Sequence, residues 1–172
     1  MNFSEFQGCH TKFNMKPRLY LETSIISYLA ALPSRDLIVA AHQQITHEWW
    51  AERRDRYELF VSELVIQEIE MGDKNAAQRR LSIVESITIL MLDDKMKILG
   101  EQLRNHANLP IKANADALHV DLAALYRMDF LLTWNCRHIA NGITRRAIDE
   151  FLKRQKMASP IIITPEEFQE ET

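Results

Sequence analysis

Short apolar segments alternate with longer segments of helical periodicity along the chain. Five segments have the length and apolar character of strands, at 18–21, 57–61, 87–91, 130–133 and 160–164. The segments between them predict helices at 24–31, 36–56, 63–71, 73–84, 93–107, 114–128 and 135–156, the last with a weaker pattern at Gly142. Strands that alternate with helices are joined by crossover connections. We therefore predict an α/β fold, a three-layer sandwich whose central, mainly parallel five-stranded sheet has helices on both faces.

The size and composition of the chain are those of one soluble globular domain. It has 172 residues, of which 47% are hydrophobic and 26% are charged. We expect residues 15–172 to form this domain, and residues 1–14, which show no periodicity, to be a poorly ordered N-terminal extension. The formal net charge is −3, so a polyanion would have to be bound through local basic clusters or a metal ion.

Cysteine usage and hydropathy indicate the compartment. The two cysteines, Cys9 and Cys136, are too few for a disulfide framework or a zinc site. No apolar segment reaches the roughly 18 residues that a membrane-spanning helix needs. We therefore expect a cytoplasmic protein with reduced thiols and no contact with a membrane.

The end of the first predicted strand carries the first candidate site residue. The strand at 18–21 is followed directly by Glu22, Thr23 and Ser24, after which the pattern becomes helical. In an open parallel sheet, ligands bind outside the carboxyl ends of the strands. Glu22 is therefore a candidate functional acid, with two hydroxyl groups beside it.

Two further acids stand in apolar helical settings. Glu68 shares a helix face with apolar residues, where a carboxylate is costly to desolvate unless a positive or hydrogen-bonding group meets it. Asp116 stands in the first turn of a helix that is apolar nearly all round. The alternatives are a solvated edge or an arginine partner for Glu68, and a helix-capping role for Asp116. His119 and Asp121 are weaker candidates, and we expect them to make structural hydrogen bonds.

Polar side chains also follow the fourth predicted strand. Asn135 either caps the segment that follows or places its amide oxygen at the same edge of the sheet as Glu22. His138 has three candidate roles, which are to ligate a metal, to hold a water or to contact a phosphate. Cys136 has no evident base beside it, so it is not a candidate nucleophile.

The candidate acids indicate metal-assisted hydrolysis. Glu22, Glu68 and Asp116 come from separate elements, and carboxylates with few histidines suit Mg²⁺ or Mn²⁺ better than zinc. Such an ion can activate a water and stabilise charge on a phosphodiester oxygen. The chain has no glycine-rich phosphate loop and no motif that places a nucleophilic serine, so nucleotide binding of that kind and acyl transfer are poorly supported.

The order of these motifs resembles the PIN-domain nucleases, specifically the VapC-type toxins of bacterial toxin–antitoxin pairs. The resemblance covers roughly residues 16 to 168. Its motifs are the strand end with acid-Thr-Ser at 20–24, the helix of Glu68 at 62–72, the helix of Asp116 at 116–124, the segment Leu-Leu-Thr-Trp-Asn-Cys-Arg-His at 131–138 and the closing segment at 163–168. The chain departs from the family at Glu22, where the family usually has Asp, and at Asn135 and His138, where it often has another acid.

The resemblance implies a PIN-like domain that cleaves RNA with Mg²⁺ or Mn²⁺, is inhibited by a cognate antitoxin protein and commonly forms a homodimer. Glu22, Glu68 and Asp116 would then hold the metal, and Asn135 would complete the catalytic group. Thr23, Thr133 and His138 would position water or phosphate. Of the basic clusters, Arg145-Arg146 is our preferred RNA contact, because it follows the fourth motif closely.

Two other readings of the same residues remain open. One is a catalytically impaired PIN-like module that binds RNA or a protein, because the extra methylene of Glu22 displaces the carboxylate by on the order of 1.5 Å, a scale to which metal sites are sensitive. The other is a structural dimerisation domain whose buried acids pair with arginines.

Overall fold

A computed structural model describes residues 15–168 of the chain, so the expected extension at 1–14 lies outside the described residues. The strands form one sheet in the order β3-β2-β1-β4-β5, and every neighbouring pair is parallel. This confirms the predicted five-stranded α/β fold. The strand bounds are β1 (Arg18–Leu21), β2 (Glu58–Ser62), β3 (Thr88–Leu90), β4 (Phe130–Leu132) and β5 (Ile161–Ile163).

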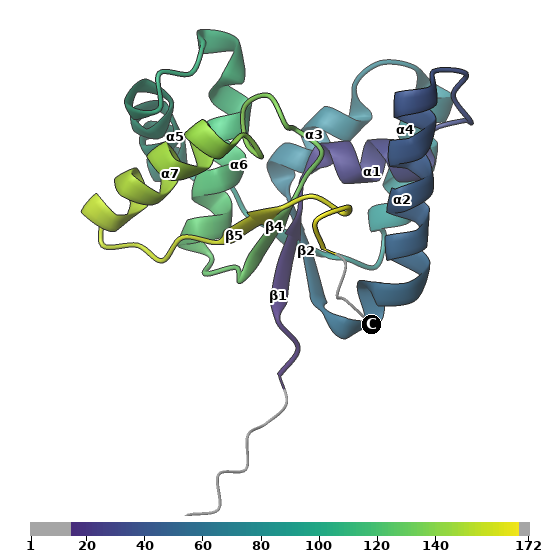
Figure 1. Ribbon diagram of the computed structural model, residues 1–172, viewed down its shortest axis with the longest axis horizontal. Coiled ribbons are helices and arrows are strands. Elements are labelled where there is room, and N and C mark those ends of the chain that lie inside the picture. The colour runs from purple at the N-terminus through teal and green to yellow at the C-terminus, as the bar shows by residue number, and fades with distance from the viewer. Residues whose placement is uncertain (1–14, 169–172) are drawn as a thin grey trace, which may run out of the picture.

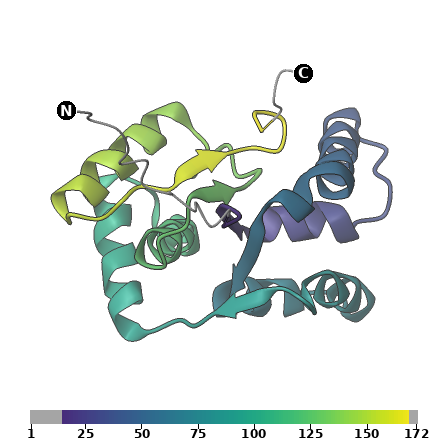
Figure 2. The same ribbon diagram turned by 90° about the horizontal axis from the view of Figure 1, so that it is seen from below.

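Helices cover both faces of the sheet, as predicted. Helices α1 to α4 pack together on one face and α5 to α7 on the other, so the sheet is the middle of three layers (Figure 1, Figure 2). Right-handed crossovers explain this division, because the chain runs from β1 to β3 in one direction across the sheet and from β4 to β5 in the other. No helix within residues 15–168 is long and apolar enough to span a membrane. The helices are α1 (Thr23–Ala30), α2 (Leu37–Arg53), α3 (Glu63–Glu70), α4 (Lys74–Val84), α5 (Asp94–His106), α6 (Asn114–Leu125) and α7 (Gly142–Arg154), with short 3₁₀ turns η1 (Arg54–Arg56) and η2 (Ile111–Ala113).

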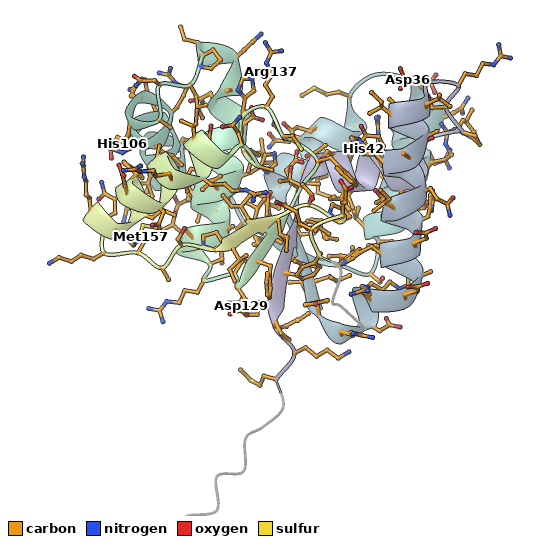
Figure 3. The ribbon with its side chains drawn as sticks, viewed as in Figure 1. Asp36, His42, His106, Asp129, Arg137 and Met157 are labelled. Carbon is orange, nitrogen blue, oxygen red and sulfur yellow. The ribbon has the colours of Figure 1, made fainter. Side chains whose placement is uncertain are left out.

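The strand order reverses between β1 and β4, and this point locates the site. Leu19 of β1 is in register with Leu59 of β2 on one side and with Phe130 of β4 on the other. Ligands of open α/β sheets bind at such a switch point, outside the carboxyl ends of the strands. Figure 3 labels Asp129, which precedes β4 at the amino ends of the strands, and Arg137, which follows β4 beyond their carboxyl ends.

The core lies around β1 and α6. Leu19, Tyr20 and Leu21 are fully buried, which suits a central parallel strand that helices cover on both faces. Helix α6 is buried over most of its length, and its Asp121 side chain is fully buried against α5. Among the described residues neither carboxylate oxygen of Asp121 has a hydrogen-bond partner, so the expectation of a structural hydrogen bond there is wrong. Burial raises the pKa of Asp121 to about 8, so the group is buried in its neutral form near pH 7.

The segment after β4 differs from the prediction. A helix was predicted from residue 135, but α7 begins only at Gly142, and residues 136–139 form a turn. The backbone amide of His138 donates to Oδ1 of Asn135 at 3.0 Å, which stabilises the first turn locally. Asn141 then caps α7, with its Oδ1 accepting from the amides of Ile143 and Thr144 at 2.9 and 3.4 Å.

Candidate metal centre

Glu22 lies at the end of β1, and its carboxylate caps α1. Its Oε2 accepts hydrogen bonds from the Ser24 amide at 3.1 Å, from the Ser24 hydroxyl and from Oγ1 of Thr133 at 2.7 Å. The side chain is only 7% exposed. A carboxylate held by this many donors has little rotational freedom, because each donor fixes the direction of Oε2. The other oxygen, Oε1, lies 4.0 Å from Nε2 of His119.

Glu68 reaches the same place from α3, which follows the neighbouring strand β2. Ser62 at the end of β2 caps this helix by accepting from the Val65 amide at 3.3 Å. Oε2 of Glu68 accepts from the Thr23 hydroxyl and contacts Nε2 of His119 at 3.0 Å. Burial favours a raised pKa for Glu68, but the hydrogen bonds and charge of His119 and the hydrogen bond of Thr23 outweigh it and lower this pKa.

His119 stands between the two glutamates. Its ring is fully buried, with Nδ1 at 2.7 Å from the Tyr20 hydroxyl and Nε2 directed at the acids. Burial favours a lowered pKa for His119, but the hydrogen bond to Glu68 and the negative charges of Glu22, Glu68 and Asp116 outweigh it and raise the pKa. The expected structural hydrogen bonds of His119 are confirmed, but the sequence did not predict that they lie inside the site.

Asp116 contributes a third carboxylate from the first turn of α6. Its Oδ1 accepts from Nδ2 of Asn135 at 2.8 Å. Asp116 also lies in the first turn of α6, where the helix dipole favours an acid, so the structure is compatible with both the functional and the structural role. The pKa of Asp116 is raised, mainly by burial and further by the charge of Glu22, against the opposing hydrogen bond of Asn135. Asp116 and Glu22 therefore act on each other electrostatically, although they lie far apart in the sequence.

The oxygen and nitrogen atoms of this group fit a divalent ion. One ligand atom each from Glu22, Glu68 and His119 lies within 4.8 Å of the other two. An ion with ligands at about 2.0–2.6 Å brings neighbouring ligands to such separations. Asp116 is outside that closest group but beside it. The structural alternative expected the buried acids to pair with arginines, but Glu22 and Glu68 pair with His119. The carboxylates of these two glutamates are the groups that could hold the ion.

The hydroxyl groups of the site lie behind the carboxylates. Thr133 is fully buried; its Oγ1 donates to Glu22 and accepts from the Asn135 amide at 2.9 Å. Thr23 donates to Glu68. Both threonines therefore orient the carboxylates of Glu22 and Glu68, and Thr23 also lines the pocket beside them.

The remaining predicted residues surround this group. His138 is half-buried, and its charge lowers the pKa of Asp116, so it lies within electrostatic range of the site. Arg145 donates to both carboxylate oxygens of Glu167, at 3.0 and 2.7 Å, and this pair lowers the pKa of Glu167 to about 2. Arg146 pairs with Glu150 at 3.0 Å and has an 83% exposed side chain. Of the two predicted RNA contacts, Arg146 is the more exposed, since the Arg145 side chain is 30% exposed.

A pocket of about 560 Å³ opens beside Glu22 and Glu68. It lies between α1 and α2, and its floor includes Thr23, Tyr28 and Gln43. His42, which Figure 3 labels, lies on α2. Its ring stacks on Trp134 at 4.0 Å between ring centroids, so the segment after β4 is fixed against this side of the site as well.

Comparison with known proteins identifies the fold. No protein-family model matches the chain, and no curated protein is detectably similar in sequence. A chain in the crystal structure of VapBC2 from Rickettsia felis bound to a promoter DNA fragment aligns with a TM-score of 0.53 at 17% identity, covering 85% of this chain and 97% of its own length. VapC20 of Mycobacterium tuberculosis, a sarcin–ricin loop cleaving toxin, aligns with a TM-score of 0.56 at 15% identity, covering 72% and 95%. The chain therefore has the PIN-domain fold of VapC-type toxins.

Proposed function

We propose that this protein is a Mg²⁺- or Mn²⁺-dependent endoribonuclease, and that it is the toxin of a toxin–antitoxin pair. One observation carries the proposal. Glu22, Glu68 and Asp116, which lie on three separate elements, meet at the switch point of the sheet, where hydroxyl and amide donors hold each carboxylate in place. A convergent group of acids at this edge is the arrangement that metal-assisted phosphodiester hydrolysis requires.

Each residue has a distinct part in the proposed reaction. Glu22, Glu68 and Asp116 would hold the ion, which supplies an activated water and stabilises charge on the phosphodiester. Asn135 donates to Asp116 and thereby fixes the carboxylate that is not held by a threonine. Thr23 and Thr133 fix the other two, as their hydrogen bonds to Glu68 and Glu22 indicate. His138 remains the proposed contact for water or phosphate.

RNA is the proposed substrate. The support is the fold shared with VapC20, which cleaves the sarcin–ricin loop, together with the basic residues of α7. We propose that Arg146 contacts the RNA backbone, while Arg145 holds the segment after β5 through Glu167. Loss of one phosphate contact makes the salt dependence of binding shallower by about one counterion. RNA affinity of Arg146→Ala at several salt concentrations measures this slope.

The proposed partners are a cognate antitoxin and a second copy of this chain, in the cytoplasm. The fold shared with a VapBC2 chain supports the first. Two large apolar side chains at the start of α2, Leu37 and Ile38, are 86% and 71% exposed and provide a surface for either partner. Light scattering of the purified protein, alone and with the product of the neighbouring reading frame, tests both.

An RNA cleavage assay with metal and site variants tests the activity. The full-length protein is incubated with structured RNA in Mg²⁺, Mn²⁺ or EDTA. We expect cleavage with either ion, and none in EDTA or with Asp116→Asn. Asp55→Asn is the matched control, because Asp55 has a 91% exposed side chain and precedes β2, at the opposite edge of the sheet. Cleavage that persists in EDTA and in Asp116→Asn would contradict the proposed mechanism.

Glu22→Asp separates the enzyme from the catalytically impaired module. Aspartate is one methylene shorter, so its carboxylate cannot keep both the Ser24 and the Thr133 hydrogen bonds in their present geometry. For an active enzyme built around glutamate, we expect Glu22→Asp to lose activity. An inert parent that gains cleavage with Glu22→Asp would favour the binding module.

A further inference from the structure

His119 is the one buried imidazole at the centre of the acidic group. We propose that its Nε2 is a direct ligand of the metal ion, and that the resulting nitrogen–oxygen ligand set selects Mn²⁺ over Mg²⁺. This inference rests on the proposed function, because it uses the same site. It adds a ligand to the carboxylates, and it names the class of ion that the site prefers.

The distances place Nε2 where a ligand belongs. It lies 3.0 Å from Oε2 of Glu68 and 4.0 Å from Oε1 of Glu22. In an octahedral ion with bonds of about 2.1–2.2 Å, adjacent ligands are about 3 Å apart and opposite ligands about 4.3 Å apart. The separation from Glu68 matches that of adjacent ligands, and the separation from Glu22 lies between the adjacent and the opposite values. The ligand atoms of His119, Glu22 and Glu68 all lie within 4.8 Å of one another, and Asp116 is not part of this set. His119 therefore forms a tighter group with the two glutamates than Asp116 does.

A chain of buried hydrogen bonds aims the ring. Nδ1 of His119 is 2.7 Å from the Tyr20 hydroxyl, which is 2.7 Å from the Ser62 hydroxyl. All three side chains are buried, with at most 1% exposed, and they come from β1, β2 and α6. Histidine ligands of metals commonly donate their other ring N–H to such a partner, which fixes the ring and leaves the second nitrogen free to bind. In the metal-bound form Nδ1–H would donate to Tyr20 and Tyr20 to Ser62. The ion would then take the place of the Nε2 proton that forms the hydrogen bond to Glu68.

The ligand chemistry determines the ion. Mg²⁺ prefers oxygen ligands and keeps much of its water, whereas imidazole nitrogen binds transition-metal ions more strongly. A site of three carboxylates discriminates little between Mg²⁺ and Mn²⁺. One imidazole in the set shifts the preference toward Mn²⁺. The sequence predicts either ion, whereas a site with His119 as a ligand is expected to prefer Mn²⁺ over Mg²⁺.

Metal binding without RNA provides the test. Isothermal titration of the full-length protein with Mn²⁺ and with Mg²⁺ gives the two affinities, and pulsed electron paramagnetic resonance detects the coupling of a coordinated ¹⁴N nucleus to bound Mn²⁺. We expect ¹⁴N coupling and an affinity for Mn²⁺ at least about 10-fold higher than for Mg²⁺. His119→Gln should lose the coupling and weaken Mn²⁺ binding by about 10–100-fold, with a much smaller change for Mg²⁺.

His138→Gln is the matched control, because His138 is a second histidine within electrostatic range of Asp116. The ¹⁴N coupling should persist in this variant. Tyr20→Phe keeps the imidazole but removes the group that orients it, so the coupling should remain while Mn²⁺ affinity falls. The spectrum of the wild-type protein decides the question even if His119→Gln does not fold.

The outcomes distinguish this inference from the proposed function. Mn²⁺ bound without ¹⁴N coupling overturns the inference, and so does an equal loss of Mn²⁺ and Mg²⁺ affinity in His119→Gln. RNA cleavage can stand in both cases. Conversely, ¹⁴N coupling that His119→Gln abolishes, in a protein that cleaves no RNA, supports the ligand assignment and removes the nuclease.

Discussion

Replacing Thr133 by valine tests whether the hydroxyl groups behind the carboxylates shape the metal centre. Thr133 is fully buried, and its Oγ1 donates to Glu22 at 2.7 Å and accepts from the Asn135 amide at 2.9 Å. Valine has nearly the same shape but cannot make either hydrogen bond. The substitution therefore leaves the packing intact and changes only the polar contacts of Glu22, a proposed metal ligand, and of the Asn135 amide.

The size of the effect follows from these two contacts. A hydrogen bond to a charged group contributes about 1.5–3 kcal/mol, and a donor left without a partner costs about 1–3 kcal/mol when it is buried. Asn135 is half-buried, so water offsets part of the second cost. We expect the free energy of unfolding to fall by about 2–3 kcal/mol. For a protein of this size the Tm should fall by roughly 4–12 °C.

The effect on the metal is separate from the effect on stability. Groups that orient metal ligands typically contribute about 10–100-fold to affinity, equivalent to about 1.4–2.7 kcal/mol. We expect Thr133→Val to weaken Mn²⁺ binding by that factor, because Oε2 of Glu22 retains only its Ser24 donors. Isothermal titration measures the affinity and urea denaturation measures the stability.

Thr133→Ser is the control for this prediction. Serine keeps the hydroxyl and loses one methyl group, which costs about 1 kcal/mol of stability. Its Mn²⁺ affinity should stay within about threefold of the wild-type value, since the hydrogen bond to Glu22 remains. Equal Mn²⁺ affinities for the valine variant and the wild-type protein would refute the role of Thr133, as would an equal loss in both variants.

Three further predictions concern the scaffold, and urea denaturation measures each. Thr46→Val removes the acceptor at 2.7 Å from the buried Nε1 of Trp134, so stability should fall by about 1–3 kcal/mol, while Thr46→Ser should lose less. Gly100→Ala should destabilise the protein by about 1 kcal/mol, because the added Cβ would lie 3.3 Å from the backbone of α6 and this crowding outweighs the higher helix propensity of alanine. Gly142→Ala is the control and should not destabilise the protein, since its added Cβ would have no atom within 4 Å. The folded-state pKa of Glu167 is about 2, below its unfolded value of about 4.3, so its ion pair stabilises fully above pH 5 and is lost as pH falls toward 2. Because this side chain is 47% exposed, Glu167→Gln should remove less than about 1 kcal/mol of that acid-dependent stability.

Local patterns predict the elements of this fold well, because each element here has a self-contained signal. The strand at 18–21 is an apolar segment between a polar lead and Glu22, and the structure has β1 at those residues. The helix of Glu68 begins at a serine cap and was predicted at 63–71, against the observed Glu63–Glu70. The segment after β4 was predicted wrongly, because Asn135 uses its side chain to close a turn, and this competes with a helix that starts at the same residue.

The site was predictable only in part, because contacts across the chain decide the rest. Glu22, Glu68 and Asp116 stood out as acids in apolar or strand-end positions, and the structure brings all three to one edge. His119 gave a weaker signal, although its spacing of three residues from Asp116 places both on one face of a helix. Its role depends on Tyr20, which is 99 positions away in the sequence, and no local pattern contains that contact.

Helix α6 shows how one buried element serves both the site and the core. Asp116 and His119 face the switch point of the sheet, whereas Asp121, two residues beyond His119, faces α5. Within residues 15–168 Glu22 and Glu68 have His119 as their ion-pair partner, and the charge of Asp116 acts on the same imidazole. Such an arrangement carries an excess of negative charge that burial makes costly. A bound divalent ion would offset this charge, so we expect a metal to stabilise the folded protein even in the absence of RNA.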